Sequence, residues 1–60
     1  MSWSPKAALL ERMEQGPITF VAALGVTRLA DRELDRLLQR LKHEGAIRFV
    51  NRKVGWELVR

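Results

Sequence analysis

Residues 31–45, DRELDRLLQRLKHEG, form the stretch that decides the fold of this 60-residue chain. Leucines recur in it at the i, i+3, i+4, i+7 spacing that places side chains on one side of an α-helix: Leu34, Leu37, Leu38 and Leu41. We therefore expect an amphipathic helix over residues 31–44, with its leucine side in the core. Asp31 is the expected N-cap, and Gly45 is expected to end the helix in a left-handed turn.

The opposite side of this helix is rich in hydrogen-bond donors. At about 100° per residue, four polar side chains lie directly opposite the leucines, Arg32, Arg36, Gln39 and His43, and Arg40 lies at the edge of that side. In the major groove of DNA, arginine can form two hydrogen bonds with guanine, and glutamine can form two with adenine. The pattern is thus typical of a helix that reads base edges.

A second interpretation of this polar face is a solvated surface held by intrahelical ion pairs. The candidate pairs are Glu33 with Arg36, Arg32 with Asp35, and Arg40 with Glu44. Against it, the three arginines follow one another at i, i+4 spacing, and like-charge neighbours at that spacing usually cost a few tenths of a kcal/mol each. Such a face is easier to explain if an anion binds to it.

The acids near the start of the helix have more than one interpretation. Asp31, Glu33 and Asp35 crowd the first turns, where a helix N-terminus often binds phosphate, and their charge would oppose a phosphate there. They would instead orient the arginines or accept a hydrogen bond from cytosine N4. The sequence leaves these two roles open.

The positive charge of the chain is concentrated in its second half. The net charge is +4; residues 1–26 are balanced, whereas residues 27–60 carry nine lysines and arginines against five acids. A basic half in a small protein suggests a polyanionic partner, most often nucleic acid. The alternative is that these are ordinary solvated charges.

Several function classes fit the composition poorly. The chain has no cysteine, no tyrosine, one histidine and no glycine-rich phosphate loop, so we expect no enzyme, cofactor, metal or small-molecule substrate. The longest apolar run, Phe20 to Leu24, is far shorter than a bilayer span, and the N-terminus lacks the features of a signal peptide. We therefore expect a cytoplasmic protein without a membrane partner, associated with the nucleoid if its source is bacterial or phage.

A first helix is expected near the N-terminus. Ser4 followed by Pro5 is a typical helix start, because serine caps the first turn and proline needs no amide there. The apolar spacing predicts a helix over residues 5–15 that ends before Gly16. Trp3 is the aromatic residue that we expect to be most exposed.

The next apolar segment is short, and its periodicity alone does not distinguish helix from strand. Its alanines, and Thr19 as a cap, favour a helix over residues 20–24 that Gly25 stops. Ile18 is expected to pair as a small strand. Residues 26–30 are then expected to form a turn, whose two inward anchors are Val26 and Leu29.

Residues 46–59 alternate with the period of β-strands and predict a hairpin with its loop at residues 51–54. The expected pairs are Ile47 with Leu58, Arg48 with Glu57, Phe49 with Trp56, and Val50 with Gly55. This register puts Ile47, Phe49, Trp56 and Leu58 on one face, which we expect to be core. The loop tip holds two adjacent cations, Arg52 and Lys53.

Together these elements resemble the winged helix-turn-helix domains of many small bacterial and phage DNA-binding regulators. The resemblance covers residues 5–59 and rests on GPITF (16–20), LGVT (24–27) and ELDRLLQRLKHEGAIR (33–48). It implies a mainly α fold with a β-hairpin (α+β), in which three helices and a C-terminal two-stranded wing form a single domain over residues 1–60. One departure is the longer separation, residues 26–30, between the second and third helices.

The resemblance also implies a function. Residues 31–44 would be the recognition helix in the major groove, and residues 51–54 the wing on the DNA backbone. We expect sequence-specific binding of double-stranded DNA by a small transcriptional regulator or phage-type DNA accessory factor. The expected site residues are Arg32, Arg36, Gln39, Arg40 and His43 on the helix, with Arg28 in the turn and Arg52 and Lys53 in the wing.

The sequence leaves open whether a second protein binds and whether DNA is the partner. Because a chain of this size offers few DNA contacts, a second copy forming a homodimer, or a neighbouring protein, is a candidate further partner. The alternative function is a protein-protein interaction module on the same fold, without direct DNA readout. Such a module would dock an acidic partner through the polar helix face or Trp3.

Overall fold

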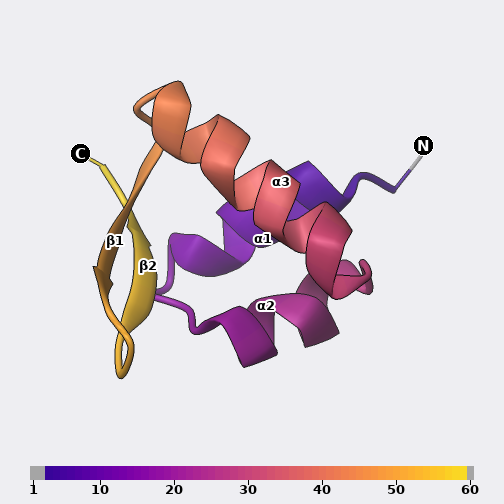
Figure 1. Cartoon of the computed structure of the whole chain (residues 1–60), viewed down its shortest axis with the longest axis horizontal. Coiled ribbons are helices and arrows are strands. Elements are labelled where there is room, and N and C mark those ends of the chain that lie inside the picture. The colour runs from indigo at the N-terminus through magenta and orange to yellow at the C-terminus, as the bar shows by residue number, and fades with distance from the viewer. Residues whose placement is uncertain (1–2, 60) are drawn as a thin grey trace.

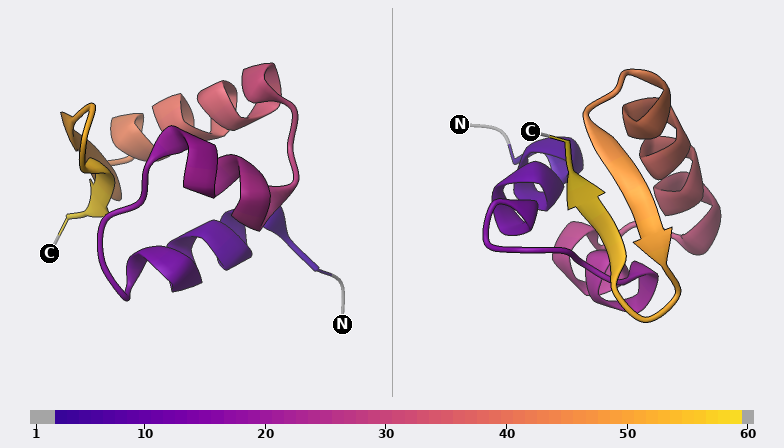
Figure 2. Two further views of the ribbon diagram at one scale, coloured as in Figure 1. Left: turned by 90° about the horizontal axis from the view of Figure 1, so that it is seen from below. Right: turned by 90° about the vertical axis from the view of Figure 1, so that its left-hand side faces the viewer.

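The computed structural model describes residues 3–59 and has three helices followed by a two-stranded antiparallel hairpin. The elements are α1 (Pro5–Met13), α2 (Phe20–Thr27), α3 (Asp31–His43), β1 (Ile47–Asn51) and β2 (Gly55–Leu58). The three helices pack together, and the hairpin covers one end of them (Figures 1 and 2). This is the expected α+β fold of three helices with a C-terminal wing.

The core forms where the three helices and the hairpin meet. Its buried residues are Leu9, Met13, Ile18, Ala23, Leu34, Leu38, Leu41, Ile47 and Trp56. The leucine stripe of α3 is confirmed, because three of its members are fully buried and the fourth, Leu37, is partly buried against them. Burying a leucine side chain stabilises the fold by roughly 1.5–3 kcal/mol, so this stripe fixes how α3 is rotated about its axis.

The start of α1 is confirmed and its end is not. The Ser4 hydroxyl accepts a hydrogen bond from the backbone N–H of Ala7 at 3.4 Å. The helix ends at Met13 rather than at residue 15, because the next residues tighten into a turn. The N–H of Gln15 bonds the carbonyl three residues before it at 3.1 Å, and Gly16 does the same.

The prediction that Gly25 stops the second helix is wrong. α2 continues through Gly25 to Thr27 and ends at Arg28, whose φ of 58° is left-handed. Thr19 does cap it, accepting a hydrogen bond from Ala22 N–H at 3.2 Å. The helix extends because Thr27 is buried, and its Oγ1 donates to the carbonyl of Ala23 at 2.8 Å. Packing thus overrides the weak helix propensity of one glycine.

The longer helix shortens the connection to α3. The expected turn over residues 26–30 is wrong, since only residues 28–30 separate α2 from α3. Val26 lies in the helix and Leu29 in the connection, and both are partly buried against the core as expected. The separation that departed from the winged helix-turn-helix pattern is therefore not present in the structure.

The two ends of α3 differ from each other in how they are capped. The prediction that Asp31 is the N-cap is wrong, because Ala30 occupies that position and provides no side-chain hydrogen bond. Asp31 lies in the first turn, where its negative charge interacts favourably with the helix dipole. The other end is as expected, with Gly45 at φ 79°. Hydrogen bonds at 3.0 Å from Gly45 N–H to Lys42 and from Ala46 N–H to Leu41 complete a Schellman motif.

The hairpin has the expected register except at its loop. The pairs Ile47–Leu58, Arg48–Glu57 and Phe49–Trp56 are confirmed. The pair Val50–Gly55 is wrong: Asn51 pairs with Gly55, and Val50 forms a bulge. The shift has a local cause, because Asn51 Oδ1 accepts a hydrogen bond from Val54 N–H at 2.8 Å and closes a shorter loop.

Ile18 pairs as a short strand segment, as expected, and its partner is β2 of the hairpin. Ile18 and Trp56 form an antiparallel bridge and exchange two backbone hydrogen bonds of 2.8 Å each. Next to this bridge, Gly55 has a φ of 92°, and a Cβ at that position would lie 2.1 Å from the carbonyl oxygen of Ile18. The segment before α2 passes beside β2 (Figure 2, right), so this close approach anchors the hairpin to the helices.

The prediction that Phe49 is a core residue is wrong. Its side chain is 48% exposed, whereas Trp56 across the pair is 8% exposed. The two rings meet edge to face, with centroids 5.1 Å apart and an interplanar angle of 66°. Strand alternation fixes the face on which Phe49 lies. On that face Ile47 and Trp56 are buried in the core and Leu58 is partly buried against it, whereas Phe49 lies beyond the covered part.

Candidate nucleic-acid interface

The outer face of α3 carries all five predicted helix residues on its exposed side: Arg32, Arg36, Gln39, Arg40 and His43. The buried leucines hold the helix in this rotation. Because an α-helix rises about 1.5 Å per residue, the three arginines follow one another at intervals of about 6 Å. The face is a regular row of donors on a rigid element.

The intrahelical ion pairs of the alternative interpretation do not form. Across residues 3–59, the ion pairs are Lys6–Glu44, with Nζ and Oε1 3.8 Å apart, and Arg48–Glu57. Glu44 thus reaches across to α1 instead of back to Arg40. In this part of the chain the guanidinium groups of the α3 arginines have no carboxylate partner.

Charge changes sign along α3. Three of the first five residues of the helix are acidic: Asp31, Glu33 and Asp35. Their negative charges are stabilised by the positive end of the helix dipole. From Arg36 onward the helix has cations and no acid up to Glu44. A shallow depression lined by Glu33, Arg36, Leu37 and Arg40 brings two of the predicted residues together. The second half of α3 is therefore its electropositive part.

The wing carries the second group of cations. Arg52 and Lys53 are exposed in the loop between β1 and β2, which the Asn51–Val54 hydrogen bond closes. β1 leads away from the end of α3, so the loop lies at the far end of the hairpin (Figure 2, right). The five residues of β1 span about 15 Å at the rise of a β-strand. The wing cations are thus separated from His43, at the end of α3.

Arg28 is exposed at the corner between α2 and α3. Its backbone N–H donates to the carbonyl of Leu24 at 2.8 Å and closes α2 in the left-handed conformation. An arginine in a conformation that favours glycine or asparagine sacrifices some stability. Arg28 lies three residues before the first residue of α3.

The sequence did not single out the apolar part of the wing. Beside the half-exposed Phe49, Val50 and Val54 are 40% and 37% exposed. The alternation of apolar residues had indicated burial for Phe49, and no local signal marked the bulge that carries Val50. The loop also lacks the Asn-Gly pair that is typical of a regular two-residue turn.

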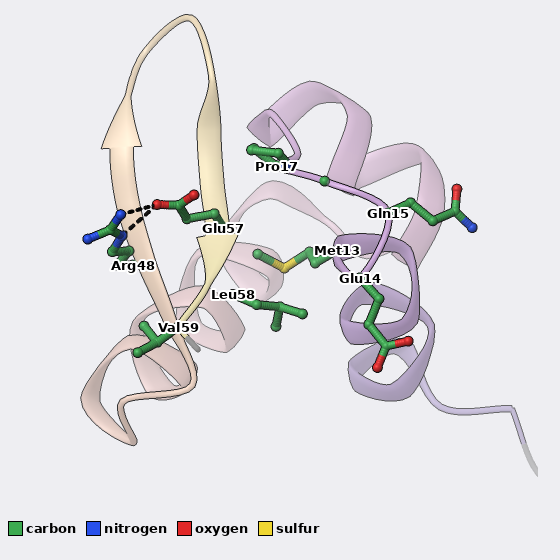
Figure 3. A pocket seen from close by; sticks show the side chains of 9 residues that line it. Met13, Glu14, Gln15, Pro17, Arg48, Glu57, Leu58 and Val59 are labelled. Carbon is green, nitrogen blue, oxygen red and sulfur yellow. Dashed lines mark hydrogen bonds and ion pairs between the residues drawn. The ribbon is translucent and has the colours of Figure 1, made fainter.

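A separate groove of about 490 Å³ lies between the turn after α1 and the end of the hairpin (Figure 3). It is lined by Met13, Glu14, Gln15, Gly16, Pro17, Arg48, Glu57, Leu58 and Val59. Its lining includes none of the predicted site residues. Arg48 points toward Glu57, and two of its nitrogens contact one carboxylate oxygen of Glu57. The cation of this groove is therefore already neutralised.

Comparisons of this chain with protein-family models, with characterised proteins and with solved structures found no match. Within residues 3–59, no helix has the length and apolar character needed to cross a membrane. No group of three or more histidine, cysteine or carboxylate side chains that could hold a metal ion occurs in the same part of the chain. The exposed cations of α3, of the corner before it and of the wing are therefore the observations that bear on function.

Proposed function

We propose that this protein binds double-stranded DNA in a sequence-specific way, as a small transcriptional regulator or phage-type DNA accessory factor. α3 enters the major groove with Arg32, Arg36, Gln39, Arg40 and His43 toward the bases. Arg52 and Lys53 contact the phosphate backbone from the wing, and Arg28 does so from the corner before α3. A winged helix-turn-helix would act in this way.

The row of exposed α3 arginines without a carboxylate partner in residues 3–59 is the observation that carries the proposal. Arg32, Arg36 and Arg40 repel one another at i, i+4 spacing, which costs the free protein stability. A bound polyanion removes that cost. Guanidinium groups also match the acceptor pattern of guanine, and each two-bond contact contributes roughly 1–3 kcal/mol of discrimination.

A second candidate function is a protein-interaction module on the same fold. The observation that favours it is Trp3, which is 61% exposed just before α1. Exposed tryptophans are frequent anchors of protein interfaces. In this alternative Trp3 docks a protein partner, and DNA is not read.

The test is selection of bound duplexes from a random pool at two salt concentrations, followed by affinity measurements over a salt series. DNA binding predicts an enriched sequence and a log–log salt dependence of about −0.9 for each phosphate neutralised. The double variant Arg36→Ala/Arg52→Ala should lose most affinity, and its slope should fall by about 1, because of these two residues only Arg52 contacts a phosphate.

The control for this test is Trp3→Ala, which leaves the α3 and wing cations intact. It should bind the selected duplex like the unmodified protein. Absence of duplex binding at low salt, combined with capture of a protein partner that Trp3→Ala abolishes, would overturn the proposal in favour of the interaction module.

A further inference from the structure

We propose that Phe49 on the wing is a stacking site for an unpaired nucleobase, so that the protein prefers DNA with a single-stranded or unpaired segment over a fully paired duplex. The inference rests on one part of the proposed function, the contact of the wing with DNA, and deepens it, because it names the state of the DNA that the wing recognises. The wing consists here of β1, the loop 52–54 and β2. The partner is the exposed aromatic face of a base.

Phe49 has the two properties that a stacking platform needs. Its side chain is 48% exposed, although it lies on the strand face that elsewhere enters the core. Its ring also packs edge to face on Trp56, whose side chain is buried and whose backbone exchanges two hydrogen bonds with Ile18. A fixed ring loses little conformational entropy when a base stacks on it.

The charge near this ring fits a nucleic acid strand. Arg52 and Lys53 follow Phe49 by three and four residues along the wing, so their Cα atoms lie at most about 11 and 14 Å from that of Phe49. The loop contains no acid, and the nearest carboxylate of β2, Glu57, is already paired with Arg48. Cations that follow the backbone together with an aromatic on which bases stack are the general features of single-strand binding.

Two further apolar side chains of the wing are exposed. Val50 lies in the bulge of β1 and Val54 in the loop, and neither has a polar group that would select one base over another. Stacking on Phe49 would therefore be tolerant of sequence, since every base has a π-face. Sequence specificity would stay with α3, and the wing would sense whether the DNA is paired.

The experiment compares two fluorescent probes, an oligothymidylate of about 12 nucleotides and a blunt duplex of similar length, for their affinity at low salt. The unmodified protein should bind the single strand more tightly than the duplex. Phe49→Leu, which stays apolar but has no ring, should lose about fivefold or more in single-strand affinity and keep its duplex affinity. Phe49→Tyr keeps the ring and should retain both affinities.

A spectroscopic measurement separates stacking from a structural effect of the substitution. In the Trp3→Phe background Trp56 is the one tryptophan left, and it contacts Phe49. Its fluorescence should change when the oligothymidylate is added and stay constant with the duplex. Thermal unfolding of Phe49→Leu checks that the wing remains folded.

Each outcome decides between the two proposals. Single-strand affinity that is equal in Phe49→Leu and the unmodified protein, with duplex binding intact, overturns the stacking site alone. Single-strand binding that depends on Phe49, without any duplex binding, supports the stacking site and overturns the proposed duplex readout. Binding to neither probe, with self-association that Phe49→Leu abolishes, overturns both and makes the exposed ring a protein contact.

Discussion

The outer face of α3 and the wing both expose arginines, but they hold them in different ways. On α3, Arg32, Arg36 and Arg40 stand at regular intervals on a helix whose rotation is fixed by buried leucines. On the wing, Arg52 and Lys53 sit in a three-residue loop beyond a bulge. Local periodicity therefore positions the first group, while the second depends on how the hairpin is attached to the rest of the chain.

The attachment of the wing to the helices is where a substitution should have the largest effect. Gly55→Ala forces a Cβ to within 2.1 Å of the Ile18 carbonyl oxygen, on a residue with φ 92°. We expect a loss of about 3 kcal/mol or more in the free energy of unfolding, since strain and displaced backbone act together. Thermal and urea unfolding followed by circular dichroism measure this loss.

Gly45→Ala is the matched control for that substitution. Gly45 also has a positive φ, 79°, but a Cβ there would meet nothing within 4 Å. Its cost should be about 1 kcal/mol, from backbone strain alone. Equal losses in the two variants would contradict the role of the Ile18 contact as the anchor of the wing.

We expect the arginines of α3 and the cations of the wing to contribute differently to DNA binding. Arg36→Ala and Arg52→Ala remove the same charge, one from the helix and one from the wing. Arg36→Ala should lower the ratio of specific to non-specific duplex affinity by roughly 5- to 100-fold, because a base contact is lost. Arg52→Ala should weaken binding to all duplexes alike and reduce the salt slope by about 1. Competition titrations with selected and scrambled duplexes measure both.

Lys6→Ala is the charge-matched control for this pair. Lys6 lies on α1, away from the predicted site, and its exposed pair with Glu44 contributes little stability. It should change neither the affinity ratio nor the salt slope by as much. If all three variants weaken DNA binding equally, only net charge matters, and the distinction between helix and wing fails.

The corner between α2 and α3 gives the smallest expected effect. Arg28→Gly relieves a left-handed conformation and should raise the free energy of unfolding by about 0.5–1 kcal/mol. If Arg28 contacts a phosphate, the same variant reduces the salt slope of duplex binding by about 1. Arg28→Lys keeps both the charge and the strain and should leave both quantities unchanged. A stabilised Arg28→Gly with an unaltered slope would remove Arg28 from the site.

Much of the candidate site was predictable because it lies on one element with a strong period. The exposure of Arg36, Gln39 and Arg40 follows from where the leucines fall, and the Schellman motif follows from Gly45. The tip cations were predictable for a similar reason, since they lie between two alternating strands. The sequence did not predict the exposure of Phe49, because its pattern is that of a buried strand residue.

The sequence by itself determined the order of the elements, the amphipathic character of α3 and three of the four predicted hairpin pairs. These features depend on spacing between near neighbours, which the backbone geometry of helix and strand converts directly into faces. Only the tertiary structure decided that α2 runs through Gly25 and that Gly55 packs against Ile18. It also decided that the helices stop short of Phe49. Those outcomes depend on which distant segment covers a given residue, and local periodicity contains no information about that.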